Sequence, residues 1–196
     1  MSKVVLITGA SSGIGKAIAV FLSEKGMIVY GTSRKPKKNH NLPFTFVTLD
    51  VLNPDSIKKA IDFIIEKENK IDVLINNAGM GITGPIEDTP TDEMRKVFDT
   101  NLFGAIDVMK AVLPQMRKQK SGKIINVTSI AGYMGLPFRG IYSATKGALE
   151  LVTEATRMEV KNFGIYIVNV APGDFATNIA AGRYHTPVFE NSAYKE

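Results

Sequence analysis

Two residues that can share a proton stand four positions apart in the run Tyr142-Ser143-Ala144-Thr145-Lys146. In a helix, positions i and i+4 lie on one face, so a phenol and an ammonium at this spacing reach the same ligand. A free tyrosine has a pKa of about 10 and is a poor base at neutral pH, but a nearby ammonium favours the phenolate. The pair predicts acid/base chemistry. When this motif stands alone, a surface helix pair is the alternative.

Two further groups of polar residues follow strand-like segments. Ser129 stands thirteen residues before Tyr142 and directly follows the apolar segment Lys123–Thr128. Its hydroxyl can donate to a carbonyl oxygen. Asn76-Asn77-Ala78-Gly79 follows another such segment, and its small residues and amides can shape the backbone around a cofactor, although by itself this run is a turn. The carboxyl ends of parallel strands face one ligand crevice, so we expect these groups to meet there.

A glycine-rich turn, Thr8-Gly9-Ala10-Ser11-Ser12-Gly13-Ile14-Gly15, joins the first strand-like segment to a helix. Bare backbone N–H groups at a helix N-terminus can bind a phosphate. Gly9 permits the tight turn, Gly13 lets a pyrophosphate approach, and Gly15 lets the helix pack on the strand. The context favours a dinucleotide site over an ordinary strand–helix turn.

The end of the second strand indicates which dinucleotide binds. An NAD-preferring site places an acidic residue there, about twenty residues beyond the glycines, to hold the ribose 2′-hydroxyl. This chain has Ser33-Arg34, followed by Lys35. A guanidinium suits a 2′-phosphate, which predicts NADP(H) in preference to NAD(H). The alternative is that Arg34 is an exposed loop cation.

The glycine turn also fits a different class of enzyme. Gly9-Ala10-Ser11-Ser12-Gly13 matches the G-x-S-x-G nucleophile elbow of hydrolases, and Asp174 and His185 follow in the required chain order. An elbow, however, needs an earlier strand and loop to supply the oxyanion hole, and only seven residues precede Thr8. A serine hydrolase is therefore a remote alternative.

Short β-branched segments alternate with helical patterns along the chain. The expected strands are Val4–Thr8, Ile28–Thr32, Phe44–Leu49, Val73–Ile75, Lys123–Thr128 and Ile165–Val170. The expected helices are Gly15–Lys25, Pro54–Lys67, Thr91–Lys118 with a break near Asn101, and Ile141–Asn162. This order predicts an α/β fold, a doubly wound parallel sheet flanked by helices, as one domain over residues 1–196 with an irregular tail or partial substrate lid from about 183.

Composition excludes several classes of function. The chain has 196 residues, 44% of them hydrophobic, and no cysteine, so one core is expected and thiolate metal sites and cysteine nucleophiles are excluded. We expect no metal, because His40 and His185 stand in polar loops without ligand partners. The absence of cysteine and of a long apolar run at the start predicts a cytoplasmic protein without a membrane partner.

A basic cluster contributes to the net charge of +5. Its members are Arg34, Lys35, Lys37 and Lys38. A solvated loop or a phosphate-binding corner explains it, and no arginine-rich helix accompanies it, so we expect no nucleic-acid partner.

Along the chain, the glycine turn, the Asn76–Gly79 run, Asn101, Ser129, the Tyr142–Lys146 pair and Pro172-Gly173 follow one another in a set order. Motifs in this order resemble those of the short-chain dehydrogenase/reductase family, with its Rossmann-type fold. The resemblance runs from Thr8 to about Thr177 and implies a catalytic tetrad of Asn101, Ser129, Tyr142 and Lys146. It implies that Asp50 and Val51 contact the adenine, that Asn76, Ala78 and Gly79 stabilise the cofactor turn, and that Pro172, Gly173 and Thr177 flank the nicotinamide. The complete set of expected cofactor-binding residues is Thr8, Gly9, Ser11, Ser12, Gly13, Ile14, Gly15, Ser33, Arg34, Asp50, Val51, Asn76, Ala78, Gly79, Tyr142, Lys146, Pro172, Gly173 and Thr177.

The implied reaction is hydride transfer between NADP(H) and a carbonyl or secondary alcohol. Ser129 and Tyr142 bond to the carbonyl oxygen, Tyr142 moves the proton, Lys146 lowers the tyrosine pKa and holds the nicotinamide ribose, and Asn101 helps to hold a water. The segment Gly135–Phe138 is similar to hydroxysteroid and retinol dehydrogenases, which bears only on the small-molecule substrate. A catalytically silent NADP-binding protein is the alternative.

The resemblance also bears on the oligomeric state and on the part of the fold that follows Pro172-Gly173. The helices Thr91–Lys118 and Ile141–Asn162 are expected to pair in a homodimer or homotetramer. Family members usually continue past Pro172-Gly173 into a further helix and strand, so Ile165–Val170 is expected to be an edge strand unless the segment after Asn178 folds back over it. A substrate lid formed by residues from Asp174 onward is then expected to be incomplete. This predicts that the 196-residue chain binds NADPH but turns over its substrate poorly.

Overall fold

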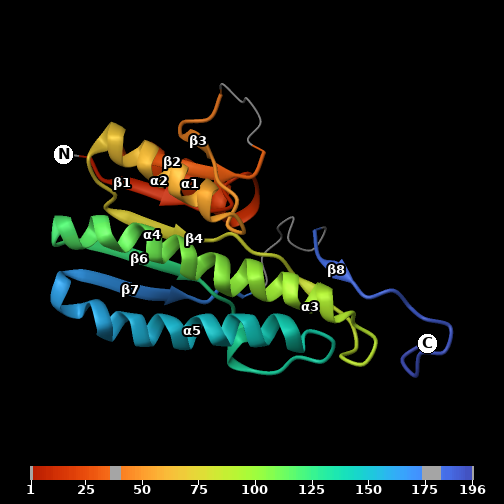
Figure 1. Cartoon of the computed structure of the whole chain (residues 1–196). Coiled ribbons are helices and arrows are strands. Elements are labelled where there is room, and N and C mark those ends of the chain that lie inside the picture. The colour runs from red at the N-terminus through yellow and green to blue at the C-terminus, as the bar shows by residue number, and fades with distance from the viewer. Residues whose placement is uncertain (1, 36–40, 174–181, 196) are drawn as a thin grey trace.

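The protein is described by a computed structural model over residues 2–35, 41–173 and 182–195. Six parallel strands form one sheet in the order β3-β2-β1-β4-β6-β7 (Figure 1). These strands are β1 (Val4–Ile7), β2 (Ile28–Ser33), β3 (Thr45–Thr48), β4 (Val73–Asn76), β6 (Gly122–Val127) and β7 (Ile165–Val170). The crossover between β3 and β4 reverses the direction in which strands are added, which is the doubly wound topology expected from the sequence.

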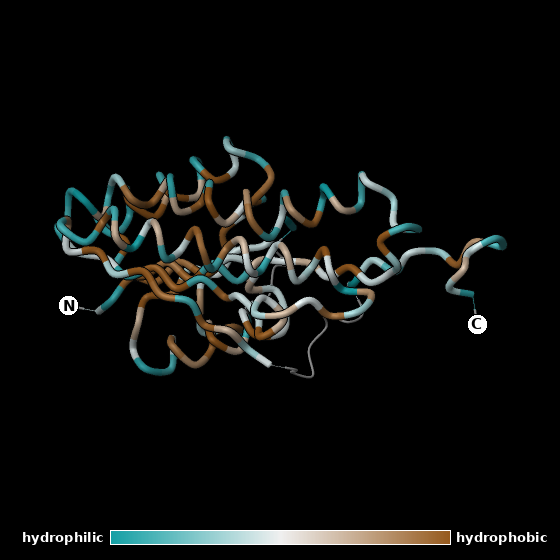
Figure 2. Tube along the Cα trace, turned by 90° about the horizontal axis from the view of Figure 1, so that it is seen from below, coloured by the Kyte–Doolittle hydropathy of each residue, from teal (hydrophilic) through white to brown (hydrophobic). Residues whose placement is uncertain are grey.

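The helices fill layers on both faces of the sheet. They are α1 (Gly13–Glu24), α2 (Pro54–Glu68), α3 (Thr91–Phe98), α4 (Gly104–Gln119) and α5 (Gly140–Val160). Residues of α2, α4 and α5 share one buried core with alternate sheet residues, and α1 contributes to a second core on the opposite face. Figure 2 shows the apolar strands concentrated between these layers.

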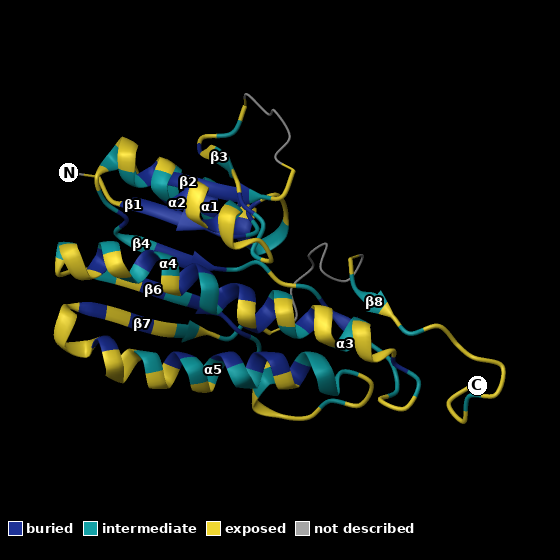
Figure 3. Ribbon diagram, viewed as in Figure 1, coloured by how far each residue is buried: buried dark blue, intermediate teal, exposed yellow. Residues whose placement is uncertain are grey.

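The first strand shows why the sequence pattern is continuous rather than alternating. All four residues of β1 are buried; Val4 and Leu6 belong to the core under α2 and α4, and Val5 and Ile7 belong to the core under α1. A parallel strand with helices on both faces has no polar side, so every position is apolar. Figure 3 shows β1 as one of the most buried elements.

The helix bounds follow local signals. Asn53 caps α2 by accepting a hydrogen bond from the Ser56 N–H at 3.0 Å, Pro54 stands in its first turn, and Asn69 ends it with a left-handed φ of 59°. The expected break near Asn101 is instead a π-helical turn, Asp99–Phe103, which joins α3 to α4 without interrupting the helical course. A π turn inserts an extra residue per turn, so it shifts the side chains without ending the helix.

The last strand lies at an edge, as the resemblance implied. Among the described residues β7 pairs only with β6, and its outward side chains Tyr166, Val168 and Val170 are exposed. The described tail does not fold back over this edge. Instead, a short strand β8 (Tyr184–His185), which sequence reasoning missed, pairs with β5 (Ile82–Thr83). Within the described residues, no helix is long and apolar enough to span a membrane.

Candidate active site

Ser129 directly follows β6 and caps a short 3₁₀ helix, Ile130–Tyr133. Its Oγ accepts a hydrogen bond from the Ala131 N–H at 3.2 Å. Because that lone pair is used by the backbone, the hydroxyl proton is free to point toward another acceptor. A hydrogen bond with the Ser129 side chain lowers the pKa of Tyr142, so the two hydroxyls lie close together.

Tyr142 lies in the first turn of α5 and is half-buried. Burial raises the pKa of its phenol above the ordinary value, and this effect exceeds the opposing effects of Ser129 and of the positive charges of Arg183 and Arg139. The phenol is therefore protonated at neutral pH. Neither arginine was among the predicted site residues, because nothing in their local sequence marks them.

Lys146 stands one turn further along α5 and is 5% exposed. Its Nζ donates to the Val127 carbonyl oxygen at 2.9 Å and lies 5.9 Å from the centre of the Tyr142 ring. Burial lowers the pKa of this ammonium from 10.5 to about 8. The influences that lower the pKa of Tyr142 come from Ser129 and the two arginines, so the expected lowering by Lys146 does not appear among them.

Asn101 lies within the π-helical turn, where its side chain is fully buried. Its Oδ1 accepts from the Met80 N–H at 2.8 Å, and its Nδ2 donates to the Met80 carbonyl at 2.9 Å and to the Thr145 hydroxyl at 3.2 Å. The amide thus links the segment after β4 to α5, where its partner Thr145 stands between Tyr142 and Lys146 in the sequence. Its amide donors are occupied by protein groups in this structure, and its expected role in holding a water stays a prediction.

The glycine turn has the close contacts that its sequence indicates. Gly9 has a φ of +68°, and a Cβ there would lie 2.8 Å from the Ala78 Cα. A Cβ on Gly15 would lie 2.4 Å from the Asn77 amide nitrogen and 2.5 Å from the Gly9 carbonyl. The N-cap of α1, Ser12, makes no side-chain capping hydrogen bond. The first N–H groups of α1 are therefore not satisfied by a side-chain cap, as a phosphate site requires.

Asn77 is a site residue that sequence reasoning passed over. Its Nδ2 donates to the Thr8 and Gly9 carbonyls, each at 3.0 Å, so it holds the glycine turn against the end of β4. The buried Thr8 hydroxyl accepts from the Asn77 and Ala78 N–H groups at 2.9 and 3.0 Å. The Thr8 hydroxyl thus holds the glycine turn to the segment after β4, and its expected cofactor contact stays a prediction. In the sequence, only the pair of adjacent asparagines could have indicated this role. The pair alone does not show which of the two side chains points to the glycine turn and which points into the core.

Asn76 points the other way. As the last residue of β4 it is buried, and its Nδ2 donates to the Ala105 carbonyl at 3.1 Å and to Asn126 Oδ1 at 3.0 Å. Successive side chains in a strand alternate between faces, which sends Asn76 into the helix-covered core. The Asn76 side chain is thus engaged within the core, and the cofactor contact expected of this residue stays a prediction.

The remaining predicted residues lie around the same ends of the strands. Ser33 ends β2 and the exposed Arg34 follows it, and Asp50 Oδ1 accepts from the Leu52 N–H at 3.0 Å beyond β3. Val51 packs against Gly104, where a Cβ would lie 2.9 Å away. Ser11, Ser12, Gly13 and Ile14 form the turn into α1, while Pro172 and Gly173 follow β7. Thr177 and Asp174 lie outside the described residues.

Comparison of the sequence with known protein families shows which family the chain belongs to. The family described as short chain dehydrogenase matches residues 3–187. The chain belongs to the short-chain dehydrogenase/reductase family. It is therefore an oxidoreductase by family, which argues against the serine hydrolase alternative.

Relatives support this membership at high coverage. A 3-ketodihydrosphingosine reductase of Bacteroides thetaiotaomicron is 49% identical over 181 residues, which are 92% of this chain and 67% of the relative. Human retinol dehydrogenase 8 is 38% identical, covering 89% of this chain and 60% of the relative. The chain thus spans about two thirds of the length of these short-chain dehydrogenase/reductases or somewhat less.

Solved structures give the same fold. A short-chain dehydrogenase from Streptomyces avermitilis matches with a TM-score of 0.91 at 35% identity, covering 97% of this chain and 73% of that one. ElxO with NADP bound matches with a TM-score of 0.86 at 34% identity, covering 93% and 79%. NAD⁺-bound xylitol dehydrogenase matches with a TM-score of 0.82 at 31% identity, covering 87% and 70%. Structural likeness therefore supports a nicotinamide cofactor and leaves the choice between its two forms to the residues of this short-chain dehydrogenase/reductase.

Proposed function

We propose that this short-chain dehydrogenase/reductase transfers a hydride between NADP(H) and a carbonyl or secondary alcohol, with Tyr142 as the general acid and base. The observation that carries the proposal is the grouping of Ser129, Tyr142 and Lys146 around the end of β6. Lys146 is held by the Val127 carbonyl, and Ser129 interacts with the Tyr142 phenol. A Cβ on Gly79, beside the glycine turn, would lie 3.6 Å from the Lys146 Nζ, so this group adjoins the dinucleotide turn.

The residues fit a dinucleotide. The turn at Gly9 and Gly15 leaves no room for side chains, and the start of α1 lacks a side-chain cap, which suits a pyrophosphate. Lys146 would hold the nicotinamide ribose, and Ser33 and Arg34 would hold a ribose 2′-phosphate. When bound, the nicotinamide supplies or accepts the hydride.

The chain's own residues handle the proton. In reduction, the Ser129 hydroxyl donates to the substrate oxygen and fixes its position, while the protonated Tyr142 phenol gives its proton to the developing alkoxide. Ser129 and the two arginines limit how far burial raises the tyrosine pKa, which keeps the phenolate product accessible. In oxidation, the same groups act in reverse.

The names of the relatives bear on the substrate class. The 3-ketodihydrosphingosine reductase and retinol dehydrogenase 8 are named for a keto compound and an alcohol. Both names are consistent with a carbonyl/alcohol pair for this chain.

The experiment is an absorbance assay of NADPH oxidation against a panel of aldehydes and ketones. At least one member should be reduced, and Tyr142→Phe should abolish its reduction while still binding NADPH. If no carbonyl is reduced, or if the phenylalanine variant keeps its turnover, the proposed function is wrong.

A further inference from the structure

A glycine stands inside α5, immediately after Lys146. The helix has 21 residues, and Gly147 lies well within it. Glycine is the least favourable residue after proline in a helix interior, because it loses the most backbone freedom there. A residue that opposes the local preference of its helix is expected where another part of the fold comes close. The neighbours of Gly147 therefore show what this position is for.

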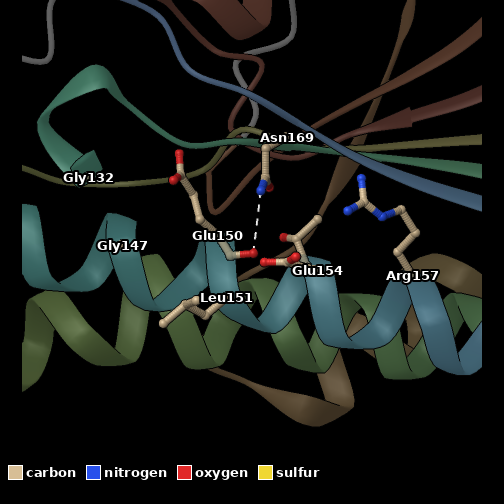
Figure 4. A pocket seen from close by; sticks show the side chains of 8 residues that line it. Gly132, Gly147, Glu150, Leu151, Glu154, Arg157 and Asn169 are labelled. Carbon is tan, nitrogen blue, oxygen red and sulfur yellow. Dashed lines mark hydrogen bonds between the residues drawn. The ribbon is translucent and has the colours of Figure 1, made fainter.

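The backbone of the 3₁₀ helix Ile130–Tyr133 lies directly against Gly147. A Cβ on Gly147 would lie 2.9 Å from the Gly132 carbonyl oxygen, a distance at which real Cβ atoms are essentially never found. Conversely, a Cβ on Gly132 would lie 3.1 Å from both the Gly147 nitrogen and the Lys146 carbonyl carbon. Figure 4 shows the two glycines near one another beside the concavity between α5 and β7 that both help to line. Two backbones thus meet here with no side chain between them.

The 3₁₀ helix is tied closely to Ser129. The Gly132 N–H donates to the Ser129 carbonyl at 2.8 Å, and the Ala131 N–H donates to the Ser129 hydroxyl oxygen at 3.2 Å. At the start of the turn, the Ile130 N–H donates to the Pro172 carbonyl at 3.1 Å. Because three bonds hold so few residues, a displacement of Gly132 is passed on to Ser129.

Two contacts with α5 flank Ser129 in the chain. Before it, the Val127 carbonyl accepts a hydrogen bond from Lys146 Nζ at 2.9 Å. After it, Gly132 rests on Gly147. Lys146 and Gly147 are consecutive, so both contacts fall on one turn of α5. The depth at which the 3₁₀ helix sits on α5 therefore sets where the Ser129 hydroxyl lies.

We propose that Gly132 and Gly147 are positioning residues of the active site, whose backbone contact sets the separation between the Ser129 hydroxyl and the Tyr142 phenol. The proposal rests on the proposed function for the roles of Ser129 and Tyr142. A substrate oxygen must meet both hydroxyls at hydrogen-bonding distance, and a misplacement of about 1 Å costs up to about a hundredfold in rate. Bare backbone at both positions holds the two hydroxyls at the required separation.

Alanine substitutions with different contact distances test the proposal. The added methyl group would lie 2.9 Å from backbone in Gly147→Ala, 3.1 Å from backbone in Gly132→Ala, and 3.7 Å from the end of an isoleucine side chain in Gly140→Ala. Gly140 begins α5 and is closer to Tyr142 in the chain than Gly147 is, so it is the matched control. We expect kcat to fall by about tenfold to a hundredfold in Gly147→Ala, by less in Gly132→Ala, and to stay unchanged in Gly140→Ala.

The affinity for NADPH separates positioning from a general loss of structure. The glycine turn is held by Asn77, at the end of β4, and not by the 3₁₀ helix. The dissociation constant of NADPH, measured by fluorescence titration, should therefore change by less than about threefold in Gly147→Ala. Circular dichroism shows whether each variant folds, and Gly132→Ala, with the less severe contact, takes the place of Gly147→Ala if the latter does not fold.

A spectroscopic measurement reads the contact without turnover. When 3-fluorotyrosine replaces tyrosine, the ¹⁹F resonance that disappears in Tyr142→Phe reports the surroundings of this phenol. Ser129→Ala should move that resonance, because it removes a hydrogen bond to the phenol. Gly147→Ala should also move it, and should add little in the Ser129→Ala background, because the glycine acts through Ser129. A glycine that serves stability alone would have no such dependence on Ser129.

The outcomes separate this proposal from the proposed function. The positioning role is overturned if the ¹⁹F resonance stays in place in Ser129→Ala or in both glycine variants, or if Gly147→Ala moves it equally in the Ser129→Ala background. If the unmodified protein reduces no carbonyl compound, the proposed function is wrong, while a shift that depends on Ser129 still supports the contact. Reduction with an unchanged kcat in Gly147→Ala supports the proposed function and contradicts the positioning role.

Discussion

Burial acts in opposite senses on the two titratable residues at the centre of the site. It raises the pKa of Tyr142 and lowers that of Lys146 to about 8, because in both cases it disfavours the charged form. At pH 7 the phenol holds its proton and Lys146 is still mainly an ammonium. This combination suits the donation of a proton to a reduced carbonyl.

Tyr142→Phe removes the phenolic proton and little volume. We expect a loss of turnover of about a thousandfold, the range of a positioned general acid, with NADPH affinity nearly unchanged. Steady-state kinetics and a fluorescence titration of NADPH measure the two quantities. Tyr166→Phe, on the exposed edge of β7, is the matched control and should keep full activity.

Lys146→Met replaces a fully buried ammonium by an apolar chain of similar length. The lowered pKa means that the folded state bears a cost on the order of 3 kcal/mol below about pH 8, and that this cost fades as the pH rises toward 10.5, where the unfolded lysine also loses its proton. The variant should therefore be inactive yet more stable than the unmodified protein at pH 7.

Urea unfolding at pH 7 and pH 10 measures this difference in stability. The advantage of Lys146→Met should shrink at the higher pH, and the exposed replacement Lys118→Met should show no such trend. A variant that is less stable at pH 7 would mean that the bond to the Val127 carbonyl outweighs the cost of burial.

Ser33→Asp combined with Arg34→Ala should shift the preference from NADP(H) toward NAD(H). The introduced carboxylate repels a 2′-phosphate and accepts a hydrogen bond from a 2′-hydroxyl. The ratio of kcat/KM for the two cofactors measures the change. Equal use of both by the unmodified protein contradicts the assignment of Arg34.

At the scale of elements, the glycine turn and the segment after β4 form one unit. Asn77 bonds to the carbonyls of Thr8 and Gly9, and Gly15 comes so close to Asn77 that a side chain has no place. The start of α1 is thus fixed by a strand that lies far along the sequence. Its position depends on packing as much as on its own glycines.

Gly15→Ala should push the Asn77 amide away and open the turn. We expect a loss of about 1–3 kcal/mol in stability, typical of overpacking, and at least tenfold weaker NADPH binding. Thermal unfolding and calorimetry measure the two effects. Gly135→Ala, where a Cβ meets nothing within 4 Å, should change neither.

At the scale of the whole molecule, apolar side chains of the described residues remain exposed on β7 and on α5. Tyr166 and Val168 are 69% and 38% exposed on the edge strand β7, and Leu151 is 70% exposed on α5. An uncovered apolar edge offers unpaired backbone groups to a second chain. The homo-oligomer expected from the family resemblance uses the helices instead.

We expect the protein to associate at micromolar concentration, as light scattering measures. Val168→Lys should reduce association through the β7 edge because a charge at an edge opposes pairing. Leu151→Lys should reduce association through α5, and Val188→Lys, in the exposed tail, should leave it unchanged. A monomeric unmodified protein would contradict both modes.

The sequence by itself determined the six strands of the main sheet, the helices between them, the glycine turn and the Tyr142–Lys146 pair, because each depends on local signals: β-branched runs, residues at i and i+4, and glycines between a strand and a helix. Asn101 and Ser129 were assigned to the tetrad through the family resemblance. Only the tertiary structure decided which asparagine of the pair holds the turn, that Asn101 lies in a π-helical turn bonded to Met80, and that Arg183 packs on Gly81 through the pairing of β5 with β8. Those outcomes depend on contacts between residues far apart in the chain, where the direction of a side chain follows from the register of packed elements and leaves no trace in neighbouring residues.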